Sequence, residues 1–235
     1  MNKHNNSSVL FFGRNSCDAS KKILNELNRL DFQVTYVESN KRGEKMPLNI
    51  IDWHGDYIIC FRSLFFLSKK LINNAKIAAI NFHPGPPEYP GSGCINFALY
   101  DEKETFGTTA HLMNEKIDNG KILEVKRFPI HENENLPDLL SRTHDALFEQ
   151  CIDFINNIER KGEVFIREKL ELSKNVKWNG LARKIKDLDK LLTIDPRVSK
   201  DELKRIIRAT YIEGFPPKIL LHGYEFELKI TQKND

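Results

Sequence analysis

Short apolar runs alternate with longer segments of mixed polarity through the first third of the chain. β-Branched and aromatic side chains fill the short runs, which is typical of buried strands. In the longer segments apolar side chains recur three or four positions apart, which is typical of helices that pack by one face. Strands alternating with helices predict an α/β fold, a doubly wound and mostly parallel sheet with right-handed crossovers. The expected strands are 9–13, 32–37, 56–60 and 76–82, and the expected helices are 17–30 and 64–73.

The middle of the chain predicts two more strands, at 107–113 and 122–128, and a long amphipathic helix at 136–158. The composition then changes after Gly162, and the rest of the chain reads as a smaller unit. Its last part has the form of a β-hairpin whose turn is His222-Gly223. The expected domains are a catalytic core at 1–162 and a C-terminal extension at 163–235, with a short helix at 200–211 and the hairpin at 218–230.

Composition limits the classes of protein that this chain can be. The 235 residues carry 36 basic and 33 acidic side chains, a balance too even for broad nucleic-acid binding. No apolar run approaches the ~18–20 residues of a membrane helix, and the first residues lack the apolar core of a signal peptide. We therefore expect a cytoplasmic protein without membrane contact. The four cysteines, Cys17, Cys60, Cys94 and Cys151, have no C-x-x-C spacing, so neither disulfides nor a zinc site is expected.

Three polar side chains suggest acyl-transfer chemistry. Asn81 and His83 end a predicted buried strand, and because they are two positions apart they point to the same side of it. That edge of an α/β sheet is where ligands bind. A stiff loop rich in proline and glycine follows, from Pro84 to Gly93, and an isolated acid, Asp118, lies between the next two strands. Asn, His and Asp together can move an acyl group onto an amine without an enzyme nucleophile.

Each member has a chemical role in such a reaction. Asn81 can donate its amide N–H to the developing oxyanion, which is worth about 3 kcal/mol. His83 can accept the proton of the attacking amine, and Asp118 can orient the imidazole and shuttle the proton. Which of His83 and Asp118 is the formal base stays open. Cys94 is disfavoured as a nucleophile because nothing marks a lowered thiol pKa, and His111 either lines the site or supports its strand.

The same segment resembles a known family. The motifs N-F-H-P-G-P-P-E-Y-P-G at 81–91 and F-G-T-T-A-H-L-M-N-E-K-I-D-N-G-K-I-L at 106–123 are similar to the signature of folate-dependent formyltransferases. The resemblance covers roughly residues 9–160. It implies a Rossmann-like core and transfer of a formyl group from 10-formyltetrahydrofolate to an amine, without a metal. It also implies that the cofactor contacts Phe61, Arg62, Ser63 and the Asp118 loop.

Within this family the chain looks like the enzymes that act on dTDP-linked amino-dideoxy sugars, such as dTDP-4-amino-4,6-dideoxyglucose. The segments C-I-N-F-A-L-Y at 94–100, F-G-R-N-S-C at 12–17 and R-A-T-Y-I-E-G-F-P-P at 208–217 carry that likeness. It implies a role in the synthesis of a surface polysaccharide (O-antigen) and a homodimer. The candidate substrate-binding residues are Pro84, Gly85, Tyr89, Gly91, Trp178, Arg183, Tyr211 and Phe215.

Other interpretations stay open at this point. The accepting amine can be at C3 or C4 of the sugar, and the extension can bind the nucleotide or form the dimer interface. Glycinamide ribonucleotide and methionyl-tRNA are alternative acceptors, and a non-catalytic folate- or nucleotide-binding module is a further alternative. A Rossmann-type oxidoreductase is disfavoured because residues 12–17 lack G-x-G-x-x-G.

Overall fold

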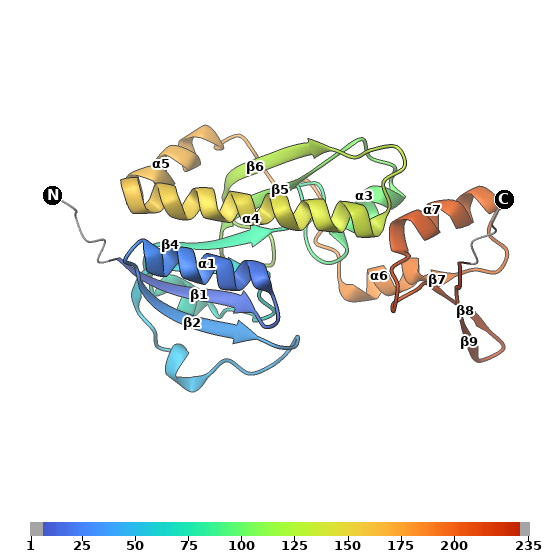
Figure 1. Ribbon diagram of the computed structural model, residues 1–235, viewed down its shortest axis with the longest axis horizontal. Coiled ribbons are helices and arrows are strands. Elements are labelled where there is room, and N and C mark those ends of the chain that lie inside the picture. The colour runs from blue at the N-terminus through green and yellow to red at the C-terminus, as the bar shows by residue number, and fades with distance from the viewer. Residues whose placement is uncertain (1–6, 231–235) are drawn as a thin grey trace.

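A six-stranded mixed sheet forms the centre of the molecule, in the strand order β2-β1-β3-β4-β5-β6 (Figure 1). The computed structural model describes residues 7–230. The first four strands run parallel, and β5 and β6 add an antiparallel edge. The predicted mostly parallel α/β sheet is therefore confirmed. The strands are β1 Ser8–Arg14, β2 Gln33–Ser39, β3 Gly55–Phe61, β4 Ala75–His83, β5 Thr105–Leu112 and β6 Ile122–Pro129.

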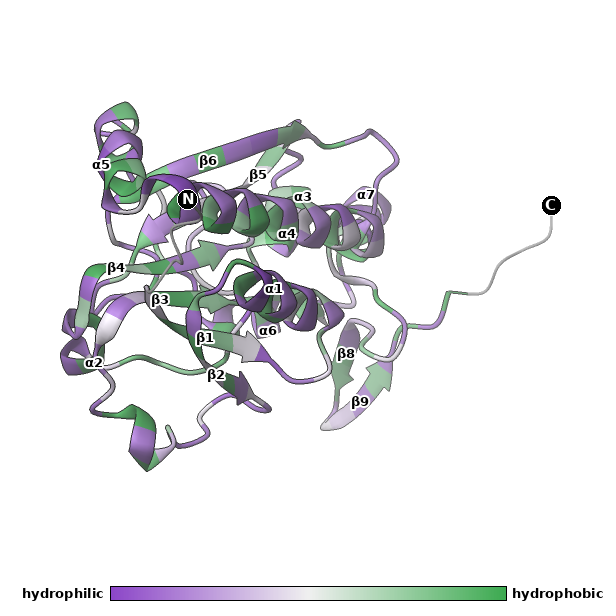
Figure 2. Cartoon of the chain, turned by 60° about the vertical axis from the view of Figure 1, so that its left-hand side comes forward, coloured by the Kyte–Doolittle hydropathy of each residue, from purple (hydrophilic) through white to green (hydrophobic). Residues whose placement is uncertain are grey.

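Helices cover both faces of this sheet. On one face lie α1 (Asp18–Arg29) and the long α4 (Leu136–Lys161), whose Phe154 packs edge-on against Phe82 of β4. On the other lie the short α2 (Lys69–Asn73) and the 3-10 turn η1 (Leu48–Ile50). Figure 2 shows the consequence: strands β3 and β4 are largely hydrophobic, whereas α4 alternates between hydrophobic and polar positions. Within residues 7–230 no helix is long and apolar enough to cross a membrane.

A helix was predicted at 64–73, but only Lys69–Asn73 is helical, so the prediction was too long. Ser68 caps its start by accepting a hydrogen bond from the Leu71 amide, at 3.2 Å. The residues before it follow a different path, since the Leu64 amide donates to the Ser39 hydroxyl at 2.9 Å. Three α-helices were not predicted, α3 (Cys94–Tyr100), α5 (Glu163–Leu172) and α6 (Ile185–Leu192).

The extension wraps back over the core from one end of the sheet to the other. Helix α5 packs against β6 and α4, and the chain then returns to the carboxyl ends of β1–β4, where the remaining elements lie (Figure 1). There α7 packs on α3, and the Asn96 side chain donates to the Ala209 carbonyl at 2.8 Å. The predicted hairpin is confirmed, with positive φ at both turn residues, His222 and Gly223. These elements are α6 Ile185–Leu192, β7 Thr193–Ile194, α7 Lys200–Thr210, β8 Lys218–Leu221 and β9 Tyr224–Glu227.

Candidate active site

Strand β4 brings Asn81 and His83 to the carboxyl edge of the sheet, as expected. Both side chains reach the Asp118 carboxylate, so they lie on the same side of the strand. The neighbouring strand β5 places His111 directly opposite Asn81 in the register. Four polar side chains from two strands and one loop therefore meet at one point.

Asp118 is at the centre of this group. Its Oδ2 lies 3.2 Å from Nδ1 of His83 and accepts a hydrogen bond from the Gly91 amide at 2.8 Å. Its Oδ1 lies 3.4 Å from Nε2 of His111 and 3.5 Å from Nδ2 of Asn81. The backbone of Asp118 has φ +42°, a left-handed conformation that Asp adopts more readily than most residues.

These contacts keep Asp118 ionised although it is buried. Burial alone raises the pKa of a carboxyl group. The charge of His83, the hydrogen bond and charge of His111 and the Gly91 amide outweigh burial and lower the pKa of Asp118 to about 2. At neutral pH this side chain is an acceptor of hydrogen bonds and has no proton to donate.

The buried His83 ring lies between two acceptors. Nδ1 faces Asp118, and Nε2 lies 3.0 Å from the backbone carbonyl oxygen of Tyr89. A neutral imidazole has one N–H, so it can donate to one of these acceptors, whereas the protonated ring donates to both. The two contacts match the two N–H groups that His83 has after taking up a proton.

His111 supports the site from β5. Its Nδ1 lies 2.9 Å from the Leu112 carbonyl oxygen, which assigns the proton of the neutral ring to Nδ1. In the neutral ring Nε2 accepts from Nδ2 of Asn81, at 3.1 Å, whereas in the protonated ring it donates to Asp118, and it is the protonated ring that lowers the pKa of that carboxylate. Of the two interpretations of His111, support of the strand and its partners is the one that these contacts favour. The second hydrogen of the Asn81 amide faces Asp118 at 3.5 Å, a weak contact from which it can be released to a ligand.

The Pro-Gly loop encloses His83. A Cβ on Gly85 would lie 2.6 Å from Nε2 of His83, so glycine is required there. The Tyr89 ring is buried and its hydroxyl donates to Asp101 at 2.8 Å, so only its backbone faces the site. Pro84 is half-buried, and its carbonyl accepts from the Cys94 thiol. Burial and the Asp118 charge raise the pKa of that thiol to about 12, which argues against a nucleophile.

The predicted cofactor segment lies at the end of β3. Phe61 is fully buried in the core between the sheet and α4, so its side chain is not available to a ligand. Arg62 follows with φ +54°, and its guanidinium donates to the Cys17 sulfur at 3.5 Å. The Ser63 hydroxyl accepts from the Phe65 amide at 3.3 Å. A cofactor at this edge would meet Arg62, Ser63 and backbone groups.

The four candidate residues of the extension fall into two pairs. Trp178 packs edge-on against His83 and His111, and Arg183 lies 3.9 Å above the Phe97 ring. Trp178 therefore contacts the two imidazoles of the site, whereas Arg183 lies on the ring of an α3 residue, and a contact of either side chain with the nucleotide stays a prediction. Tyr211 ends α7 and is half-buried, whereas the Phe215 side chain is 79% exposed.

A positively charged group lies at the carboxyl edge of the sheet, and sequence reasoning missed it. Arg14 ends β1, Arg62 follows β3, and His144 projects from α4. Burial and the two arginine charges lower the pKa of His144 to about 4. Nothing in the sequence neighbours of His144 reveals the two arginines that the fold brings close to it.

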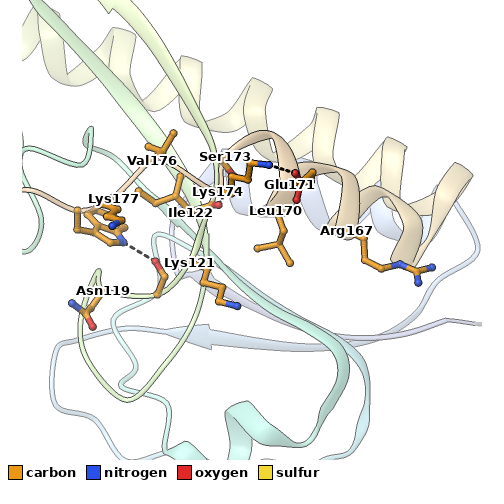
Figure 3. A pocket seen from close by; sticks show the side chains of 12 residues that line it. Asn119, Lys121, Ile122, Arg167, Leu170, Glu171, Ser173, Lys174, Val176 and Lys177 are labelled. Carbon is orange, nitrogen blue, oxygen red and sulfur yellow. Dashed lines mark hydrogen bonds and ion pairs between the residues drawn. The ribbon is translucent and has the colours of Figure 1, made fainter.

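A groove of about 640 Å³ lies beside the Asp118 loop, between β6 and α5 (Figure 3). Lys121, Arg167, Lys174 and Lys177 give it a basic rim, and Trp178 closes the end nearest to the histidines. Among residues 7–230 no group of three or more His, Cys, Asp or Glu side chains could hold a metal ion.

Residues 5–155 match the sequence profile of the formyl transferase family, which is described as "Formyl transferase". The match includes Asn81, His83 and Asp118. The chain belongs to this family. The resemblance inferred from the two motifs is confirmed.

Relatives and solved structures agree with this assignment. GDP-perosamine N-formyltransferase of Brucella melitensis biotype 1 is 24% identical over 70% of this chain and 60% of the relative. Methionyl-tRNA formyltransferases also match, among them proteins of 25% and 28% identity. The chain spans 60% or less of the length of these relatives.

Two solved structures have the same fold. A sugar N-formyltransferase from Shewanella sp. has a TM-score of 0.73 at 20% identity, over 97% of this chain and 98% of the other. An N-formyltransferase from Helicobacter canadensis, in complex with folinic acid and dTDP-3-aminofucose, has a TM-score of 0.64 at 14% identity, over 93% and 85%. The likeness to the Shewanella structure covers the extension as well as the core.

Proposed function

We propose that this protein transfers a formyl group from 10-formyltetrahydrofolate to the amine of a nucleotide-linked amino sugar. The observation that carries the proposal is the Asp118 carboxylate, buried yet ionised and in contact with both Asn81 and His83. This group suits an acyl transfer that needs a proton acceptor and an oxyanion donor and uses no thiol nucleophile. Membership of the formyl transferase family supports it.

His83 is the proton acceptor in this proposal, and Asp118 is its partner. The mutual stabilisation of charge between His83 and Asp118 keeps the carboxylate ionised and favours the proton on the imidazole. The His83 ring has acceptors at both nitrogens, so the protonated ring keeps two hydrogen bonds. The accepting amine replaces the Tyr89 carbonyl as the partner of Nε2 while the proton moves.

The donor supplies a formyl carbon bonded to its N10. The amine nitrogen forms a bond to that carbon, the bond from carbon to N10 breaks, and the proton that the amine loses is balanced by the proton that N10 gains. Asn81 donates to the oxyanion by giving up its weak contact with Asp118. We place the folate at the β3 edge, near Arg62, Ser63 and the Asp118 loop.

The sugar nucleotide is proposed to lie on the Pro-Gly loop side, near Gly85, Gly91 and the extension. Arg14 and Arg62 lower the pKa of the nearby His144, so this edge of the sheet offers positive charge to an anionic group, either the phosphates of the acceptor or a carboxylate of the folate. We propose a dTDP-linked amino-dideoxy sugar destined for a surface polysaccharide. The four cysteines are free and buried, which suits a cytoplasmic location.

A substrate panel tests the proposal. The protein is mixed with 10-formyltetrahydrofolate and dTDP-, GDP- and UDP-linked amino sugars that carry the amine at C3 or C4. We expect release of tetrahydrofolate with at least one of them, and a formamide product by mass spectrometry. Glycinamide ribonucleotide and methionyl-tRNA serve as competing acceptors. If no sugar nucleotide in the panel releases tetrahydrofolate faster than a blank without acceptor, the proposal is wrong.

We also propose that the protein is a homodimer joined through its C-terminal hairpin. Strand β9 is exposed along its whole length and has no strand partner on its outer edge among the described residues. Tyr224, Phe226 and Leu220 leave apolar side chains exposed there. Such an edge favours pairing with a second chain.

The substitution Phe226→Asp is therefore expected to turn a dimer into a monomer, because it places a charge in the buried centre of the pairing. Light scattering coupled to size-exclusion chromatography measures the change. Leu48→Ser, at an exposed position of η1, is the matched control and should leave the mass unchanged. A dimer that survives Phe226→Asp at micromolar concentration would place the interface elsewhere.

A further inference from the structure

The extension crosses the Pro-Gly loop in a segment that we call the strap, residues 178–183. Three backbone hydrogen bonds join them: the Asn179 amide to the Pro87 carbonyl at 3.2 Å, the Arg183 amide to the Pro90 carbonyl at 3.1 Å, and the Ser92 amide to the Arg183 carbonyl at 2.8 Å. The strap follows the loop along most of its length.

The strap and the loop approach so closely that side chains are excluded between them. A Cβ on Gly180 would lie 2.3 Å from the Glu88 carbonyl oxygen. A Cβ on Gly91 would lie 2.3 Å from the Arg183 carbonyl oxygen, and Gly91 also has φ +85°. Glycine is therefore required on both sides of the contact. Gly91 is the residue whose amide donates to Asp118, so the strap holds one hydrogen-bond partner of this carboxylate in place.

Trp178, at the start of the strap, contacts the Asp118 loop and the two imidazoles that face Asp118. Its indole N–H donates at 2.8 Å to the carbonyl of Gly120, which lies two residues after Asp118 in the same loop. Its ring packs edge-on against His83 and His111, with centroids 5.7 and 5.1 Å away. These are the two imidazoles that face the Asp118 carboxylate.

We propose that the strap positions the Asp118 carboxylate and that Trp178 is a positioning residue for the reaction. This differs from the predicted role of Trp178 as a substrate-binding residue, and it rests on the proposed formyl transfer. The physical reason is that Asp118 lies in a loop and in a left-handed conformation, so its position depends on neighbours outside the loop. A displacement of about 1 Å of such a group can cost about 10²-fold in rate.

Four variants of the full-length protein test the proposal. Trp178→Phe keeps the ring and removes the donor to Gly120, so kcat should fall about fivefold to tenfold. Trp178→Ala removes both contacts and should lower kcat about 10²-fold. Gly180→Ala displaces the strap while it keeps Trp178, and kcat should fall about tenfold. KM for both substrates should stay within about threefold. Leu181→Ser is the matched control, since its side chain is 92% exposed in the same segment.

Three results would overturn the proposal. If KM for the sugar nucleotide rises tenfold or more in Trp178→Ala at unchanged kcat, Trp178 binds the nucleotide. If kcat falls only in proportion to the unfolded fraction, measured by circular dichroism, the strap stabilises the fold and nothing more. If Gly180→Ala equals Leu181→Ser, the strap does not transmit its position to the site.

A measurement without turnover separates this proposal from the proposed function. The Gly91 amide, which donates to the Asp118 carboxylate, is followed by NMR at a fixed pH. Trp178→Ala should shift the Gly91 amide proton signal, because the Asp118 loop loses its bond from the indole, and Leu181→Ser should leave the signal unchanged. If the unaltered protein is inactive and the NMR results are as expected, the formyl transfer is refuted and the positioning role stands. If the protein is active and the Gly91 signal is unmoved in Trp178→Ala, the positioning role is refuted.

Discussion

Asp118→Asn is expected to lower kcat for formyl transfer by about 10⁴-fold, with KM changed little. The amide has the shape of the carboxylate, and Asn tolerates the left-handed backbone at this position as well as Asp does. The substitution therefore removes the charge and leaves the loop conformation in place. The amide oxygen can still accept from the His83 N–H, but a neutral amide lacks the negative charge that stabilises the imidazolium formed when His83 takes up a proton.

The same substitution changes how stability depends on pH. The pKa of Asp118 is depressed in the folded protein to about 2, below its value of 3.8 when unperturbed. A depressed carboxyl pKa contributes stability above the unperturbed value, and that stability is lost as the pH falls from about 4 to about 2. The contribution at neutral pH is about 2 kcal/mol. The variant Asp118→Asn lacks the contribution of this carboxylate, so its free energy of unfolding should fall less steeply between about pH 4 and about pH 2.

Two measurements check these expectations. Steady-state rates of tetrahydrofolate release at pH 7 give kcat and KM, and urea unfolding between pH 2 and pH 5 gives the stability. Asp153→Asn is the control, because this exposed carboxylate of α4 pairs with Lys126 of β6 and with no residue of the site. A loss of kcat below about tenfold in Asp118→Asn would remove this carboxylate from the mechanism.

The core of the site could be predicted from the sequence because a strand imposes a strict alternation on its side chains. Asn81 and His83 had to share a side once 76–82 was identified as a strand, and the edge of the sheet followed from the order of strands and helices. The hairpin at the C-terminus was predictable for a similar reason, since its two turn residues need positive φ.

The contacts made through backbone groups could not be predicted. The strap is joined to the loop by amides and carbonyls, which every residue has, so Asn179 and Arg183 carry no mark of it in the sequence. Trp178 was predicted to bind the substrate, but its ring packs against His83 of β4 and His111 of β5, which are far from it in the sequence. Phe61 was a reasonable cofactor residue by its place in the motif, yet β3 is a central strand with both faces covered, so its side chain belongs to the core.

His83→Gln is expected to lower kcat by about 10³-fold. Glutamine keeps a polar amide in the buried position and can still donate to the Tyr89 carbonyl, so the Pro-Gly loop should stay in place. It cannot take up a proton at neutral pH, so the amine must lose its proton to solvent, and a positioned acid–base group is worth about 10²–10⁴-fold in rate. Glutamine also avoids the cavity that alanine would leave.

The matched variant is His111→Gln, which separates the two imidazoles around Asp118. His111 contacts Asp118 and Asn81 and has the Leu112 carbonyl at its other nitrogen, so it acts through these partners and its loss should cost only about tenfold in kcat. The rates of both variants are measured from pH 6 to pH 9. In this range the slope that reports the proton acceptor should vanish in His83→Gln and persist in His111→Gln, because Asp118, with a pKa of about 2, does not titrate there. Equal losses in the two variants, with the slope kept in His83→Gln, would assign the proton to a different acceptor.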